Sequence, residues 1–361
     1  MRSIRVLVID DSALMRKLIP QLLASDPGIE VVGTAMDGLF ALKKMEELKP
    51  DVVTLDVDMP RMDGIETLRR IVAEFGTPVV MLSSLTERGA TLTLQALEIG
   101  AFDFVTKPQD AISVHIKDIA EELIAKVKAA FENPLARLRT RKVESTTVPR
   151  ERKASRTTRT AEQVLAIGIS TGGPNALSYL LPRLPANFPA AILIVQHMPP
   201  GFTEMFASRL NTNCALEVKE AQDGDLVVPG RVLIAPGGRH LKIKRLPLGT
   251  IAVISDSAPV NGHRPSADVL FRSAAAEYGS SVTGLIMTGM GADGAEGIGE
   301  IKAQGGMTIA QDEKSSVVFG MPKSAIERNY IQQVVSLGDL HGFLMNHYLG
   351  KEIAHGTATC C

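Results

Sequence analysis

The segment Val164-Leu-Ala-Ile-Gly168-Ile-Ser170-Thr-Gly172-Gly-Pro174 predicts a strand, a tight turn and a helix in immediate succession. Apolar, partly β-branched residues end at Ser170, two glycines follow, and proline is favoured in the first turn of a helix. The glycines allow a sharp bend and leave space for a carbonyl group to approach the serine hydroxyl. The Gly168-x-Ser170-x-Gly172 spacing also matches the nucleophile-elbow pattern. The alternative is a glycine-rich turn whose serine only caps a helix.

The composition is that of an ordinary globular protein with two domains. The chain has 361 residues, 45% apolar and 22% charged, a length that usually divides between two cores. A net charge of −1 gives no general attraction to nucleic acid or to an anionic membrane. No apolar run approaches the ~20 residues that span a bilayer, and the early strand leaves no room for a signal peptide. Because Cys360 and Cys361 are adjacent, we expect a reduced, cytoplasmic setting without a disulfide framework.

Residues 1–131 are predicted to form a first domain in which strands and helices alternate. The strands are expected at Arg5–Asp10, Glu30–Ala35, Val52–Asp56, Pro78–Ser83 and Phe102–Thr106, and the helices at Ala13–Ala24, Gly38–Leu48, Ile65–Glu74, Arg88–Ile99 and Ile112–Phe131. Five such units indicate a parallel, doubly wound α/β sheet, whose ligands bind beyond the carboxyl ends of the strands.

Polar residues fall at those strand ends: Asp10 and Asp11, Asp56, Ser83 and Lys107. Carboxylates gathered in one crevice repel each other unless a hard divalent cation and a lysine lie among them. Mg²⁺ fits, because it takes few carboxylates and keeps room for water and a phosphoryl oxygen. Asp56 is then a plausible phosphoryl acceptor, since the metal and Lys107 neutralise the transferring group. A single aspartate at a strand end usually only begins a turn, so this interpretation depends on the whole set.

This first domain resembles a response-regulator receiver domain over its whole length. The resemblance is carried by Asp10-Asp11, Leu55–Gly64, Ser83-Ser84 and Phe104–Pro108. It implies a flavodoxin-like fold and phosphate transfer from a sensor histidine kinase to Asp56. It also implies that Asp10, Asp11, Asp56 and the carbonyl of Asp58 hold Mg²⁺, that Ser83 and Lys107 bind the phosphoryl group, and that Phe104 reorients on phosphorylation. From the residues alone, Phe104 alternates with Phe102 and could equally belong to the core.

Residues 132–162 are predicted to form a flexible basic linker. Between Asn133 and Thr160, nine arginines and lysines face two glutamates, and the apolar periodicity disappears. Such a segment cannot bury enough surface to fold alone and should be an extended tether. A nucleic-acid-binding arm is the alternative, but no aromatic side chains are interleaved for base stacking. We therefore expect no nucleic-acid partner, and favour docking to an acidic protein surface.

Residues 163–349 are predicted to form a second, larger doubly wound α/β domain, followed by a tail at 350–361. Strands are expected at Val164–Ser170, Ala190–His197, Arg231–Ala235, Ile251–Asp256, Val282–Thr288, Met307–Gln311 and Gln333–Leu337, and helices at Asn175–Leu184, Glu204–Leu210, Ala267–Tyr278, Gly294–Ala303, Lys323–Arg328 and Leu340–His347. Paired strands around Gly230 and His240–Lys244 indicate a short antiparallel excursion. A second α/β sheet argues against a helix-turn-helix DNA-binding output domain.

Ser170, His197 and Asp293 fall at or just beyond predicted strand ends. If the order of the sheet brings these ends together, they supply a nucleophile, a base and an orienting carboxylate. The backbone N–H groups of Thr171 and Met290, in the two glycine-rich turns, are placed to receive an oxyanion. Each residue also has an ordinary interpretation: Asp293 could cap a helix, and His240 and His263 compete with His197 for the role of base.

Nucleotide binding is the main alternative for this second domain. Gly289-x-Gly291-x-x-Gly294 follows a strand and opens a helix, with Asp312 after the next strand, as in the dinucleotide fingerprint. Against it, Asp293 would place a carboxylate where a pyrophosphate must lie. The order Ser170, His197, Asp293 also differs from the Ser, acid, His order of α/β-hydrolases. A non-catalytic module whose binding is controlled by phosphorylation stays open as a further alternative.

The second domain resembles the chemotaxis protein-glutamate methylesterase (CheB) family. The resemblance is carried by Gly168–Gly173, Gln196–Met198, Gly262–Ser266 and Thr288–Gly294, and with the receiver domain it covers nearly the whole chain. It implies hydrolysis of glutamate γ-methyl esters, and deamidation of glutamines, on cytoplasmic chemoreceptor helices, without a cofactor or membrane insertion. It also implies that Ser170, His197 and Asp293 form the triad and that Thr171 and Met290 line the oxyanion hole. His263, Arg264 and the Cys360-Cys361 tail receive no role. We expect the unphosphorylated receiver to cover the esterase site, and phosphorylation at Asp56 to uncover it.

Overall fold

The computed structural model describes residues 2–107, 116–132 and 160–355. The chain divides into two compact units, Met1–Ser145 and Thr146–Cys361. Most of the predicted linker and the Cys360-Cys361 pair lie outside the described residues. No helix in the described part of the chain is long and apolar enough to cross a membrane.

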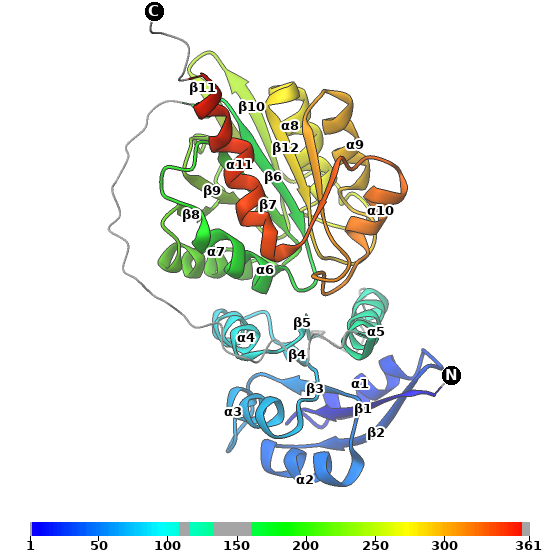
Figure 1. Cartoon of the computed structure of the whole chain (residues 1–361). Coiled ribbons are helices and arrows are strands. Elements are labelled where there is room, and N and C mark those ends of the chain that lie inside the picture. The colour runs from blue at the N-terminus through cyan, green and yellow to red at the C-terminus, as the bar shows by residue number, and fades with distance from the viewer. Residues whose placement is uncertain (1, 108–115, 133–159, 356–361) are drawn as a thin grey trace, which may run out of the picture. The chain divides into compact units, whose positions relative to one another are not determined.

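The first unit is a five-stranded parallel sheet with helices on both faces (Figure 1). Its strands are β1 (Ile4–Ile9), β2 (Ile29–Ala35), β3 (Val52–Asp56), β4 (Val79–Ser83) and β5 (Asp103–Thr106), and its helices are α1 (Met15–Leu23), α2 (Gly38–Leu48), α3 (Gly64–Arg70), α4 (Glu87–Ile99) and α5 (Ile116–Glu132). The strand order β2-β1-β3-β4-β5 is that of flavodoxin-like folds. A π-helical turn, Ile71–Phe75, extends α3. The predicted α/β class and strand positions are confirmed for this unit.

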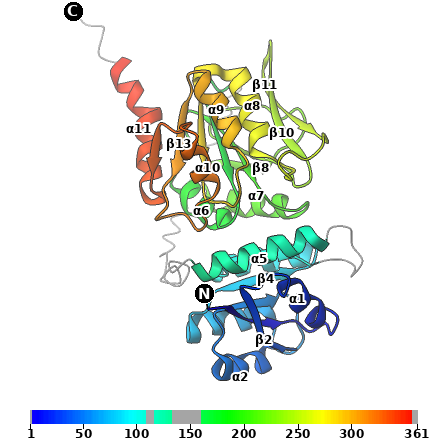
Figure 2. The ribbon, with the colours of Figure 1, turned by 90° about the vertical axis from the view of Figure 1, so that its right-hand side faces the viewer.

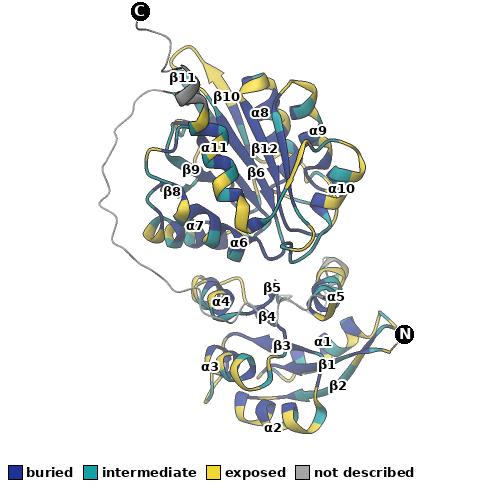
Figure 3. Cartoon of the chain, viewed as in Figure 1, coloured by how far each residue is buried: buried dark blue, intermediate teal, exposed yellow. Residues whose placement is uncertain are grey.

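Local sequence explains where the helices of this unit begin. Asp37, Asp63 and Thr86 each stand just before a helix, and each side chain accepts a hydrogen bond from a backbone N–H of the first turn. The strands β3 and β4 are buried along their whole length, as expected for a parallel sheet covered on both faces (Figure 3). Helices α1 and α5 pack against each other, as do α2 and α3. The strand ends are thereby held at one edge of the sheet.

The second unit contains a seven-stranded parallel sheet and a separate two-stranded hairpin (Figures 1 and 2). The parallel strands are β6 (Val164–Ile169), β7 (Ala191–Gln196), β8 (Glu217–Glu220), β9 (Arg231–Ile234), β12 (Val282–Ile286), β13 (Met307–Gln311) and β14 (Gln333–Val335); the hairpin is β10 (His240–Leu246) with β11 (Gly249–Ser255). The helices are α6 (Gly173–Leu180), α7 (Phe202–Asn213), α8 (Ala267–Tyr278), α9 (Ala295–Ala303), α10 (Met321–Glu327) and α11 (Leu337–His355).

The large sheet has the strand order β14-β13-β12-β6-β7-β9-β8, in which the side where new strands are added changes at β6. From β6 the chain first builds outward through β7, then returns to β12 on the other side. Such a switch point opens a crevice at the carboxyl ends of the strands, where doubly wound folds bind their ligands. The core around it is apolar: Phe271 on α8 is fully buried and packs with residues of β6, β7 and β12.

Three details differ from the sequence-based expectation. The antiparallel excursion is present, but β10 pairs with β11, whereas Arg231–Ile234 after Gly230 joins the parallel sheet. Ile251–Asp256 was predicted as a strand of the domain, and it forms the second strand of this hairpin. Strand β8 was not predicted, because it is a four-residue edge strand with charged residues at both ends. Helix α11 runs to His355, eight residues beyond the predicted end.

Candidate functional site

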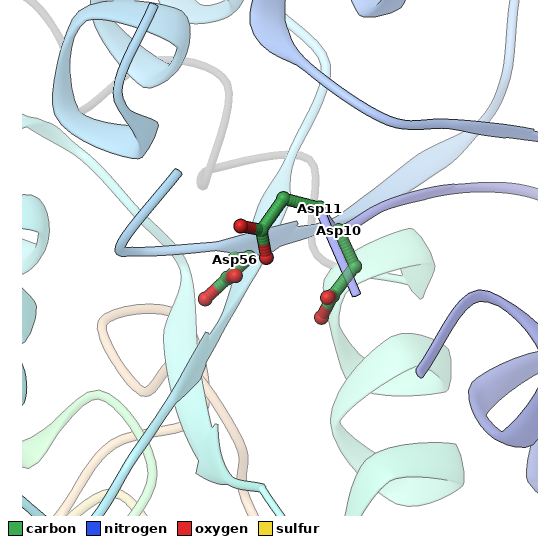
Figure 4. Close-up of side chains that lie close together, drawn as sticks. All are labelled: Asp10, Asp11 and Asp56. Carbon is green, nitrogen blue, oxygen red and sulfur yellow. The ribbon is translucent and has the colours of Figure 1, made fainter. Parts of the chain in front are cut away.

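Three aspartates meet at the carboxyl ends of β1 and β3 in the first unit. One carboxylate oxygen from each of Asp10, Asp11 and Asp56 lies within 4.8 Å of the other two (Figure 4). Asp10 and Asp56 are buried, whereas Asp11 is exposed. Asp10 and Asp11 follow β1 and Asp56 ends β3, its neighbour in the sheet. The strand order therefore brings Asp56 beside Asp10 and Asp11, although Asp56 lies 46 residues after Asp10 in the sequence.

Lys107 neutralises part of this negative charge. Its ammonium group lies 2.8 Å from a carboxylate oxygen of Asp10 and 2.8 Å from one of Asp56. Burial lowers the pKa of Lys107, but the two carboxylates outweigh burial and raise it above its ordinary value. Burial raises the pKa of Asp56 to about 6, against the attraction of Lys107 and with a further contribution from the charge of Asp10. An additional cation at this site would favour the ionised form of Asp56.

The donor set fits Mg²⁺. Carboxylate oxygens are its usual protein ligands, and exposed Asp11 leaves the crevice open to water and to a phosphoryl group. The backbone N–H of Asp58 donates to Asp56 Oδ1 at 3.3 Å, while the Asp58 side chain is exposed and pairs with Arg88 at 3.1 Å. The predicted role of the Asp58 carbonyl as a metal ligand stays a prediction.

The two other receiver residues singled out from sequence lie on β4 and β5. Ser83 ends β4, is buried, and donates its hydroxyl hydrogen bond to the Ser84 carbonyl at 3.3 Å. Phe104 on β5 is also buried, and the Lys126 ammonium lies 5.3 Å from the centre of its ring. Lys126 also donates to the Phe104 carbonyl at 2.6 Å. The predicted phosphoryl-binding and switching roles of Ser83 and Phe104 stay predictions.

In the second unit, Ser170 and His197 follow paired residues of neighbouring strands. Ile169 of β6 pairs with Gln196 of β7, and the His197 N–H donates to the Ile169 carbonyl at 3.2 Å. Because adjacent strands lie about 4.8 Å apart, the two residues leave the sheet side by side. The Gln196 amide donates to the carbonyls of Ser170, at 3.1 Å, and His197, at 3.2 Å. Sequence reasoning missed this bridge, since nothing in the local pattern shows where a glutamine side chain will point.

The turn that carries Ser170 depends on close backbone contacts. Gly172 has a φ of +75°, a conformation that favours glycine. Gly289, in the turn after β12, approaches so closely that a Cβ there would lie 2.8 Å from the Cβ of Ser170. Thr288, the residue before Gly289, ties the two turns together, because its hydroxyl donates to the Thr171 carbonyl at 2.9 Å. Both glycine-rich turns therefore meet at the serine.

His197 and Asp293 form a hydrogen-bonded pair across the switch point. The distance from His197 Nε2 to Asp293 Oδ2 is 2.8 Å, and Asp293 is buried. The same carboxylate accepts hydrogen bonds from the Ser266 hydroxyl at 2.6 Å and the Ala267 N–H at 2.7 Å, at the N-terminus of α8. Burial raises the pKa of Asp293, but its hydrogen bond and charge interaction with His197 and the α8 donors outweigh burial, so the pKa lies below its ordinary value. Asp293 is thus ionised and rigidly held.

Pairing at Nε2 leaves the other ring nitrogen of His197 for chemistry. Nδ1 is buried and has no hydrogen-bond partner among the described residues. No described residue accepts a hydrogen bond from the backbone N–H of Thr171 or of Met290 either. The arrangement thus combines a serine, an imidazole with one nitrogen to spare, and two backbone donors at one edge of the sheet.

The competing interpretations from sequence receive little support from this geometry. His240 is buried, with its Nδ1 accepting from the Ser266 N–H and its Nε2 bonded to the Ala258 carbonyl, so both ring nitrogens serve the fold. The glycine fingerprint Gly289–Gly294 packs against Ser170, and its Asp293 caps α8. A pyrophosphate there would face a carboxylate. His263 stacks on the ring of His197, whose Nε2 is the ring nitrogen that pairs with Asp293.

Fold and site together define a response regulator whose receiver domain is followed by a hydrolase domain. The response regulator receiver family matches residues 6–117 and the CheB methylesterase family matches residues 165–344. A protein-glutamate methylesterase/protein-glutamine glutaminase of Koribacter versatilis is 58% identical over 348 residues, covering 95% of both chains. Its counterpart from Pyrococcus abyssi is 46% identical, over 93% of this chain and 91% of that protein.

The chain belongs to the CheB methylesterase family. Its second unit is also similar to the crystal structure of the Thermotoga maritima CheB methylesterase catalytic domain, at 44% identity and a TM-score of 0.50, covering 51% of this chain and 98% of that one. The family resemblance predicted from the sequence is confirmed. A receiver domain implies a kinase as phosphodonor and is consistent with Mg²⁺ binding. The names of the curated relatives describe a methylated protein substrate.

Proposed function

We propose that this protein is a phosphorylation-regulated serine hydrolase that demethylates glutamate γ-methyl esters, and deamidates glutamines, on the cytoplasmic helices of chemoreceptors. The full-length similarity to protein-glutamate methylesterases supports the reaction. The observation that carries the proposal is the 2.8 Å contact between His197 and buried Asp293, beside Ser170 at the switch point of the sheet. A nucleotide-binding role has no comparable support.

In the proposed mechanism, the Ser170 hydroxyl attacks the ester carbonyl while His197 Nδ1 takes its proton. Nδ1 is the free nitrogen because Asp293 holds Nε2, which keeps the imidazole in one tautomer and stabilises the imidazolium that forms. The imidazolium then returns the proton to the departing methoxide, and methanol leaves. Water attacks the acyl-serine in the same way and releases the glutamate carboxylate.

The developing oxyanion would accept hydrogen bonds from the Thr171 and Met290 N–H groups, each worth about 3 kcal/mol of transition-state stabilisation. A glutamine side chain forms the same acyl-serine and releases ammonia in place of methanol. The same site therefore accounts for both activities in the names of the relatives.

In the receiver domain, we propose that Asp56 accepts phosphate from a sensor histidine kinase. Asp10, Asp11, Asp56 and the Asp58 carbonyl would hold Mg²⁺, which supplies charge neutralisation when bound. Lys107 contacts Asp56 and Asp10 and would bind a phosphoryl oxygen. Ser83 and Phe104 are proposed to bind the phosphoryl group and to respond to it.

The test is methanol release from a methyl-esterified chemoreceptor fragment. We expect wild type to release methanol and Ser170→Ala to be slower by about 10⁴-fold or more, as for other serine triads. Ser208→Ala, an exposed serine on α7, is the matched control. A folded Ser170→Ala protein with wild-type turnover would remove Ser170 from the mechanism, whereas methanol release by neither protein would contradict the substrate assignment.

A further inference from the structure

The loop between β11 and α8 surrounds the proposed base from a side that the triad does not use. Within it, Val260 and His263 exchange backbone hydrogen bonds of 3.0 and 2.9 Å and close a tight turn. The two central residues, Asn261 and Gly262, have φ values of +54° and +77°. This is the left-handed backbone of a two-residue hairpin turn. The turn therefore fixes the position from which His263 projects.

The imidazole of His263 stacks on the imidazole of His197. The ring centroids are 4.0 Å apart and the ring planes differ by only 10°. Asp293 holds His197 at one atom, Nε2, which leaves the ring free to tilt about that hydrogen bond. A flat ring against its face removes this freedom. The two contacts together define both the direction and the plane of the His197 ring.

The same loop also holds the carboxylate that orients His197. Ser266 and Ala267, at the end of the loop, donate to Asp293, and the Asn261 amide donates to Asp268 at 2.7 Å and lies 3.5 Å from Asp293. Asp268 in turn accepts from the Gly297 N–H in the first turn of α9 at 2.7 Å. The first turn of α8 thus donates to Asp293, just before α9, and the first turn of α9 donates to Asp268 of α8. His263 therefore projects from a braced loop.

We propose that His263 is a positioning residue, which holds the ring plane of His197 and thereby fixes the direction in which Nδ1 points through turnover. This inference rests on the proposed hydrolase function. It assigns His263 no proton transfer, because the orienting carboxylate is already engaged by His197. A stacking role needs only a flat ring, and that requirement separates it from a chemical role.

The stack also covers one face of the His197 ring. The charged groups around the pair are Asp293 at His197 Nε2, buried Asp268 behind Asn261, and exposed Arg264, whose guanidinium donates to the carbonyls of Asp256 and Ser257.

The decisive experiment compares His263→Ala with His263→Phe in the full-length protein. We expect His263→Ala to lower kcat by about tenfold to a hundredfold, as for other small misplacements of catalytic groups, with KM nearly unchanged. His263→Phe keeps a flat ring and should recover most of the lost kcat. His341→Ala, a histidine on α11, is the control and should match wild type.

Two further measurements keep the result interpretable. The four tyrosines all lie in the second unit and the chain has no tryptophan, so tyrosine fluorescence reports folding of the hydrolase unit in each variant. The ring proton resonances of His197, assigned with His197→Gln, should shift in His263→Ala, because the stacked ring is removed, whatever the substrate. This readout tests the stack even if wild type releases no methanol, in which case the proposed function fails by itself.

Three outcomes would overturn the inference. Unchanged kcat and unchanged His197 resonances in His263→Ala would show that the stack positions nothing. A His263→Phe protein as slow as His263→Ala would mean that the ring nitrogens act chemically. An increase in KM at constant kcat would make His263 a substrate-binding residue.

Discussion

The aspartate crevice of the receiver domain and the serine site of the hydrolase domain both lie at the carboxyl ends of parallel strands. They differ in how fully their carboxylates are paired with hydrogen-bond donors and positive charge. In the receiver, three carboxylates each place one oxygen within 4.8 Å of the others, and Lys107 forms ion pairs with two of them. In the hydrolase, the single carboxylate of the triad is buried and receives hydrogen bonds from His197, Ser266 and Ala267. The first site has excess negative charge, whereas the second is balanced before any ligand arrives.

This difference indicates two kinds of site. A crevice with surplus negative charge gains most from a cation and changes when a phosphoryl group joins it, which suits a switch. A site whose dipoles are already oriented stabilises a transition state without reorganising, which suits catalysis. Conditions that alter charge should therefore affect the receiver strongly, and small changes of geometry should affect the hydrolase strongly.

Metal removal should give the largest contrast between the two sites. We expect chelation of divalent cations to abolish phosphorylation of the protein by a small phosphodonor, because the carboxylates then repel the incoming group. Methanol release without phosphodonor should be unaffected. Intact-protein mass and methanol release measure the two. If chelation also lowered the unstimulated rate of methanol release, the hydrolase site would itself depend on a metal, against this prediction.

Asp56→Asn should abolish stimulation of the hydrolase by the phosphodonor while divalent cations are still present. The amide cannot accept phosphate, so we expect the phosphodonor to leave methanol release unchanged in this variant, while the unstimulated rate equals that of wild type. Asp51→Asn is a matched control, since Asp51 immediately precedes β3, at the opposite end of the strand from Asp56, and pairs with Arg2. Stimulation that survives in Asp56→Asn would place the phosphoacceptor elsewhere.

Gly289→Ala should show the sensitivity of the hydrolase to geometry. The new methyl group would meet the Met321 sulfur and lie 2.8 Å from the Ser170 Cβ, so Ser170 must move. We expect a loss of about a hundredfold in kcat, the usual cost of an ångström-scale misplacement. Gly342→Ala on α11 should keep full activity, because an added Cβ there would meet no described atom within 4 Å apart from its own helix backbone and chain neighbours. Wild-type kcat in Gly289→Ala would show that the serine position tolerates displacement.

The positions of both sites could be predicted from sequence because parallel strands end at one edge of a sheet. Asp10, Asp56, Ser170 and His197 were recognisable as polar residues at the ends of apolar runs. The pairing of β11 was not, because an isolated strand of seven residues does not reveal whether its neighbour is parallel. The Gln196 bridge and the His263 stack were also out of reach, since they depend on side-chain directions across segments far apart in the chain.

Acid should expose the smallest effect, the contribution of Asp293 to stability. Its pKa in the folded state lies below its ordinary value, so its stabilisation is complete above an unfolded pKa of about 3.9 and is lost as the pH falls toward the folded value. We expect Asp293→Asn to lower the free energy of unfolding of the hydrolase unit by about 2 kcal/mol at neutral pH. The loss should shrink as wild type is acidified.

Urea unfolding followed by tyrosine fluorescence measures this, because all the tyrosines lie in the hydrolase unit. The receiver provides the internal comparison: the pKa of Asp56 is raised, so its ionisation opposes folding at neutral pH, the reverse of Asp293. Because the receiver domain contains no tyrosine, Asp56→Asn should leave the tyrosine-detected unfolding transition unchanged. If the difference between wild type and Asp293→Asn stays constant from neutral to acidic pH, the Asp293 carboxylate is not preferentially ionised by the fold, and the hydrolase site lacks the charge balance that distinguishes it from the receiver.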